Sequence, residues 1–100
     1  MNAARGEAAL TVDGRGVTLR PSFQALVAAE ADLGPLFDLV ERAAAGKLSL
    51  HEIATLFWHV VVERDDGLTR ERIGEAILEV GLAAVTPALR TLIVQILQGR

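Results

Sequence analysis

The chain has 100 residues, a formal net charge of −3, no cysteine and four aromatic residues in 100. This length fits one domain, 1–100, which buries roughly 60–70% of its unfolded surface. The lack of cysteine excludes disulfides and thiolate metal sites. The mild negative charge argues against a phosphate-binding protein, which needs a clustered basic surface.

The first third predicts a β-hairpin at residues 7–20, preceded by a flexible N-terminus at residues 1–6. Ala8, Leu10 and Val12 alternate with outward positions, which is the period of a strand. Asp13-Gly14 is typical of a tight hairpin turn, because glycine accepts positive φ without steric cost. The alternation then resumes in the second strand.

The rest of the chain, residues 22–98, predicts a helical part. Ser22 caps a helix that runs to about Leu33, with Phe23, Leu26, Val27 and Leu33 on one apolar face. Glu30 lies on or beside this face. We expect it to bond to the hairpin backbone or to an arginine, rather than to act as a catalytic acid.

Three further caps divide the central region into helices. Pro35 opens a helix to about Ala45. Ser49 and Glu52 form a capping box for a helix that is expected to reach about Glu63. Thr69 then caps a helix that ends before Gly81.

The last helix carries more apolar residues than one core-facing stripe needs. The sequence leaves two alternatives for where this helix begins. It begins near Leu82 and bends at Pro87, or Thr86 caps it and Pro87 is its first residue. Its stripe consists of Leu82, Val85, Leu89, Leu92 and Ile96. The candidate partner or oligomer surface consists of Leu89, Ile93, Val94 and Leu97. The alternative is that this helix is the central core helix. The surface predicts a homo-oligomer, because monomers rarely leave such a patch in water.

Together these elements predict an α+β fold, an N-terminal β-hairpin packed on a bundle of four to five short α-helices. No signal-peptide pattern is visible, and the apolar run 82–97 is shorter than the ~20 residues of a membrane span. We therefore expect a cytoplasmic protein with no membrane partner.

No residue is nominated as catalytic, cofactor-binding or metal-binding, and no cofactor is expected. His59 and Glu63 lie four residues apart, but an HExxH motif and a GxSxG elbow are both absent. A minor alternative is helix-turn-helix DNA binding, with Arg70 and Arg72 near the start of the reading helix. Acidic residues on that helix and the net charge argue against it, so no nucleic-acid partner is expected.

The order of short motifs resembles the gene transfer agent tail assembly chaperone family, a group of small phage-derived proteins. The motifs are RGEAALTVDG (5–14), LRPSFQAL (19–26), AEADLG (29–34), GKLSLHEI (46–53) and IGEAILEVGLAA (73–84). The resemblance implies a non-enzymatic chaperone that binds the tape measure protein, keeps it soluble and recruits tail tube protein. A rival interpretation of the same family is a structural tail component, the tail tube subunit.

Overall fold

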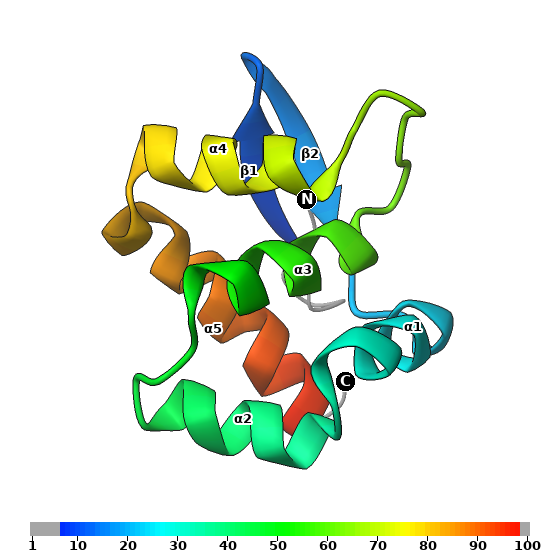
Figure 1. Ribbon diagram of the computed structural model, residues 1–100, viewed down its shortest axis with the longest axis vertical. Helices are drawn as coiled ribbons and strands as arrows, with labels where there is room; N and C mark the ends of the chain where they lie inside the picture. Colours follow the sequence, from blue (N-terminus) through cyan, green and yellow to red (C-terminus); the bar gives the residue numbers. More distant parts are fainter. Residues whose placement is uncertain (1–6, 99–100) are drawn as a thin grey trace.

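The computed structural model describes residues 7–98, in which one β-hairpin is followed by five helices (Figure 1). This arrangement confirms the predicted α+β fold. The predicted flexible N-terminus, residues 1–6, lies outside the described residues.

The hairpin forms where the alternation predicted it. Strands β1 (Ala8–Val12) and β2 (Arg15–Leu19) pair in antiparallel register. Asp13 and Gly14 have φ angles of 52° and 77°. Two successive positive φ angles are typical of a type I′ turn, whose twist matches that of the strands it joins.

The helices follow the predicted caps closely. Ser22, Ser49 and Thr69 each accept a hydrogen bond from a backbone N–H three residues later. The Ser49 N–H in turn donates to the Glu52 carboxylate, which completes the capping box. The helices are α1 (Phe23–Leu33), α2 (Leu36–Ala44), α3 (Leu50–Val60), α4 (Arg70–Val80) and α5 (Leu82–Gln98).

Helix α3 occupies the centre of the molecule, with contacts to α1 and α4 (Figure 1). The hairpin turns the inner face of β1 onto α4 and α5, so its alternate residues are buried. The largest fully buried side chains come from five different elements. They are Phe57, Leu19, Leu39, Leu56, Ile73, Ile77 and Leu92.

Helix α3 ends at Val60, and the prediction that it reaches Glu63 is wrong. Val61 instead forms an antiparallel bridge with Leu19, flanked by two backbone hydrogen bonds of 2.7 and 2.9 Å. This pairing gives β2 a partner on its second edge. A two-stranded hairpin is marginal alone, so the bridge supports it at the expense of the last turn of the helix.

The apolar face predicted for α1 is only partly correct. Phe23 and Val27 are 82% and 50% exposed. The face that meets the core consists of Leu26, Ala29 and Leu33, at spacings of three and four residues. Because Ala29 is small and fully buried, α1 can approach α3 closely without help from the two larger side chains.

Within residues 7–98, Glu30 bonds neither to the hairpin nor to an arginine, so the expectation from the sequence is wrong there. It is exposed, and its carboxylate accepts a 3.0 Å hydrogen bond from the Leu36 N–H. Pro35, at the cap position of α2, provides no side-chain hydrogen bond. Glu30 therefore caps α2 from the neighbouring helix, satisfying one of the free amides at its start.

Helix α5 begins at Leu82 and continues through Pro87, which settles the two alternatives for its start. The Thr86 hydroxyl donates to the Leu82 carbonyl at 2.9 Å, so it bonds within the helix and does not cap it. No single helix among residues 7–98 has the length and apolar content to cross a membrane. Helices α4 and α5 meet these criteria only as a pair, which is bent by 119°.

Replacing Ser49 by Ala is expected to lower the free energy of unfolding by about 0.5–2 kcal/mol. The substitution removes the acceptor for the Glu52 N–H and breaks one half of the capping box. Urea unfolding followed by circular dichroism measures the loss. Coinciding midpoints for the two proteins would show that the box contributes nothing to stability.

Candidate protein-binding site

Helix α5 buries one side and exposes another. Val85 and Leu92 are buried, whereas Val94 and Leu97 are 43% and 55% exposed. At 3.6 residues per turn, Val94 lies about 200° around the helix from Leu92. The exposed apolar flank is therefore separate from the stripe that faces the core.

A shallow groove of about 290 Å³ runs between α2 and α5. Its lining consists of Ala43 and Ala44 from α2, with Thr86, Leu89, Arg90, Ile93 and Val94 from α5. Because the two alanine side chains on the α2 wall are short, an apolar side chain from another protein has room to enter. We call these seven residues the α2–α5 groove.

The structure brings together three of the four predicted surface residues, Leu89, Ile93 and Val94, in the lining of this groove. Leu97 is not part of the lining. It lies three residues beyond Val94, so it extends the same apolar flank toward the end of α5. The alanines of α2 could not be assigned to this surface from sequence, because nothing in their local pattern indicates which helix they face.

A larger cleft of about 690 Å³ separates β2 from the loop that precedes α4. Three arginines enter it, and each pairs with a carboxylate. Arg15 meets Asp65 at 3.3 Å, Arg20 donates to Glu7 at 2.7 Å, and Arg72 pairs with Asp13. Two of these pairs, Arg15–Asp65 and Arg72–Asp13, link the loop and α4 to the hairpin.

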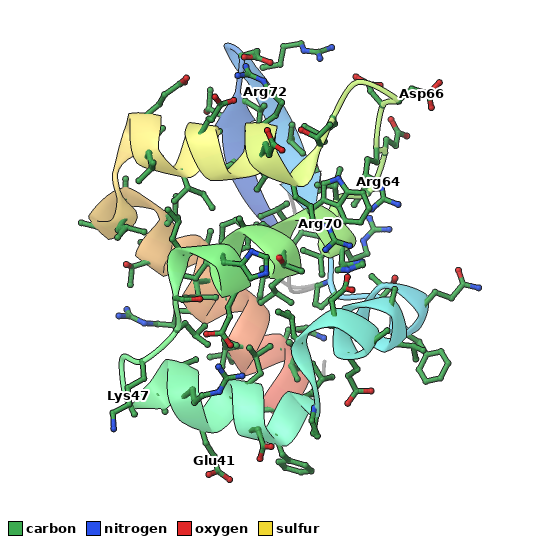
Figure 2. The ribbon with its side chains drawn as sticks, viewed as in Figure 1. Glu41, Lys47, Arg64, Asp66, Arg70 and Arg72 are labelled. Carbon is green, nitrogen blue, oxygen red and sulfur yellow. The ribbon has the colours of Figure 1, made fainter. Side chains whose placement is uncertain are left out.

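A second polar cluster joins α1, α3 and α4. Asp32 accepts from His59 Nε2 and from Arg70, both at 2.6 Å. The guanidinium groups of Arg70 and Arg64 lie over the Trp58 ring, at 4.7 and 3.8 Å from its centroid (Figure 2). Cation–π contacts of this kind fix long side chains against an aromatic face.

These contacts bear on the helix-turn-helix alternative. Both arginines at the start of α4 have partners within the chain: Arg70 bonds to Asp32, and Arg72 bonds to Glu75 at 2.7 Å. Base contacts would require breaking these pairs. In the described part of the chain, no group of three or more His, Cys, Asp or Glu side chains could hold a metal ion.

The described residues thus present a largely apolar groove and two clusters of paired charges. The comparison with protein families gives this arrangement a context. The profile of a family described as "Phage tail tube protein, GTA-gp10" matches residues 5–99. The chain belongs to this family. Neither the curated proteins nor the solved structures include a significant match.

Membership of this family confirms the link to a phage-like tail of a gene transfer agent that the motif order indicated. The family description names a tail tube protein, which is a structural class and not a class of enzyme. It does not name a chaperone, so that narrower role is treated below as a proposal.

Stability is expected to fall in acid because of two carboxyls. The His59 hydrogen bond, followed by the charge of Arg70, holds the pKa of Asp32 below its ordinary value. The Ser49 backbone N–H, assisted by Arg42, lowers the pKa of Glu52. A carboxyl whose pKa is lower in the folded than in the unfolded state stabilises the fold at pH values above its unfolded pKa. This stabilisation is lost as the pH falls through the pKa of the folded state.

Urea midpoints should therefore change little above about pH 5 and decline from about pH 4 downward. Replacing Asp32 by Asn should make this decline shallower, because one of the two groups no longer titrates. A decline that is equally steep in Asp32→Asn and the wild type would show that the cluster does not contribute.

Proposed function

We propose that this protein is a non-enzymatic, protein-binding component of tail assembly in a phage-like gene transfer agent. The family match over residues 5–99 carries the proposal. The α2–α5 groove supports it, because an apolar groove beside an exposed apolar flank suits protein–protein contact. We place this assembly step in the cytoplasm.

Two forms of this role are open to experiment, and the family description favours the first. In that form the protein is a subunit of the tail tube and remains in the finished particle. A tube subunit must contact its own copies through two different surfaces, since a heterologous contact is what generates a ring or filament.

The second form is an assembly chaperone that holds the tape measure protein, recruits tail tube protein and then leaves. The geometry of the groove favours it. The groove runs between two helices, and five of its seven lining residues are alanine or aliphatic, with Thr86 and Arg90 as the polar members. This geometry suits a partner helix that docks along it by ridge-into-groove packing.

Self-association is part of the same proposal. Val94 and Leu97 would form an apolar contact between copies of the chain, so that the isolated protein is a homo-oligomer. A partner helix in the groove would compete for this surface. We therefore expect partner binding to displace the self-contact.

Mass spectrometry of purified particles, with polymerisation of the isolated protein, separates the two forms. A tube subunit should be abundant in particles and should form rings or filaments on its own. A chaperone should be absent from particles and should co-purify with the tape measure protein when the two are co-expressed. Absence from particles together with no tail partner in co-expression would overturn the proposed function.

A further inference from the structure

Among the described residues, the two most exposed large apolar side chains lie on α1 and α2, and neither is part of the α2–α5 groove lining. Phe23 is 82% exposed and Phe37 is 77% exposed, while Val27, one turn after Phe23, is 50% exposed. An exposed aromatic ring contributes a large apolar area, and such residues anchor protein interfaces.

Helical spacing groups these side chains on one exposed face of each helix. Val27 follows Phe23 by four residues and precedes Glu30 by three, so all three share a face of α1. The Glu30 carboxylate then reaches the Leu36 N–H, which places it at the first turn of α2, the turn that also carries Phe37. We call Phe23, Val27, Glu30, Phe37 and Glu41 the α1–α2 strip.

Glu41 continues the strip along α2, four residues after Phe37. It is exposed, and its side chain points away from the body of the molecule (Figure 2). The strip is therefore apolar at its anchors and acidic between and beyond them.

The segment that carries the strip holds acidic charges, and the arginines that flank it, Arg20 and Arg42, are paired with Glu7 and Glu52. From residue 21 to residue 41 the chain has no lysine, arginine or histidine, and its charged residues are Glu30, Asp32, Asp38 and Glu41. Asp32 is neutralised by its contacts with His59 and Arg70. The other three form no ion pair within residues 7–98, so they leave a negative potential around the exposed phenylalanines.

We propose that the α1–α2 strip binds an amphipathic helix of another protein whose polar face is basic. The two phenylalanines bury themselves in its apolar face, and the carboxylates pair with its lysines or arginines. Like-signed charge excludes nucleic acid and anionic membrane surfaces, because complementary potential selects the partner. The strip shares no residue with the lining of the α2–α5 groove, and the variants below leave that lining unchanged, so this inference is tested without the proposed function.

Two synthetic peptides test the proposal. Each has about 18 residues, enough to form a helix, and the same leucine-rich apolar face. One carries lysines on its polar face and the other glutamates. Fluorescence anisotropy of the labelled peptides against the whole protein should show at least about tenfold tighter binding of the lysine peptide.

Variants then separate the strip from general attraction to an acidic protein. Phe23→Ser with Phe37→Ser should weaken the lysine peptide about tenfold or more, because the anchors are gone. Leu78→Ser is the matched control, since Leu78 is 59% exposed on α4. Glu41→Gln, which removes one exposed carboxylate of the strip, should weaken binding at low salt.

Amide shifts of the wild type, measured by NMR as the lysine peptide is added, provide a readout that does not depend on any variant. The proposal expects changes confined to α1 and α2. An equal loss of affinity for the lysine peptide in the phenylalanine variant and in the Leu78→Ser control would overturn the proposal. Amide shifts centred outside α1 and α2 would overturn it as well. A third outcome would also overturn the proposal. If the wild type is a dimer that the peptide does not dissociate, and the double phenylalanine variant is a monomer, the strip binds a second copy of this chain.

Discussion

Replacing Phe57 by Ala is expected to lower the free energy of unfolding by about 3–5 kcal/mol. Phe57 is fully buried on the central helix α3, in the cluster that joins the hairpin to the other helices. Truncating it removes apolar contacts and leaves a cavity. A domain of this size has about 5–15 kcal/mol in total, so the loss is a large fraction of its stability.

The matched control is Phe23→Ala, which changes the same residue type at a position that is 82% exposed. It should alter the free energy of unfolding by no more than about 0.5 kcal/mol. Urea unfolding of the two variants and the wild type gives the comparison. Similar losses at the two positions would contradict the assignment of Phe57 to the core and Phe23 to the surface.

The second large effect concerns the two sides of α5. Leu92→Glu should unfold the protein, because Leu92 is fully buried and the new carboxylate has no partner there. Val94→Glu makes the same kind of change at a position that is 43% exposed. It should leave the melting curve close to that of the wild type while weakening self-association.

Circular dichroism melting curves and light scattering measure these two outcomes. If Val94→Glu unfolds the protein, α5 is core on all sides and the binding surface must lie elsewhere. If the wild type is a monodisperse monomer at high concentration, the predicted homo-oligomer is wrong.

The elements that the sequence predicts well depend on local chemistry. The hairpin turn needs positive φ at adjacent positions, and Asp13-Gly14 supplies it. Three helix starts, those of α1, α3 and α4, are marked by a side chain that reaches an amide only three residues away, at Ser22, Ser49 and Thr69. Each of these interactions involves residues only a few positions apart, so it can be predicted from the local sequence.

The features that the sequence misses depend on long-range contacts. Asp32 and His59 are 27 residues apart, and no local pattern brings them together. The end of α3 is set by the pairing of Val61 with Leu19, which helical periodicity cannot anticipate. Phe23 has the spacing of a core residue, yet α1 packs through a neighbouring face.

The candidate site also combines a feature that the sequence predicts with features that depend on long-range packing. The apolar excess of α5 is visible in the sequence and predicts an exposed flank. The second wall of the groove, Ala43 and Ala44, emerges only when α2 is placed beside α5. The exposure of Phe37 likewise depends on where α2 lies.

Capture of tail proteins by groove variants tests the central claim most directly. The wild type, Val94→Glu and Leu78→Glu would each be co-expressed with the tape measure and tail tube proteins and recovered by affinity tag. Leu78→Glu is the matched control, because Leu78 is exposed on α4 and outside the groove lining. We predict that the wild type and Leu78→Glu retain a tail protein and that the folded Val94→Glu loses it. Equal retention by all three proteins would contradict binding through the α2–α5 groove, and no retention by the wild type would contradict a role in tail assembly.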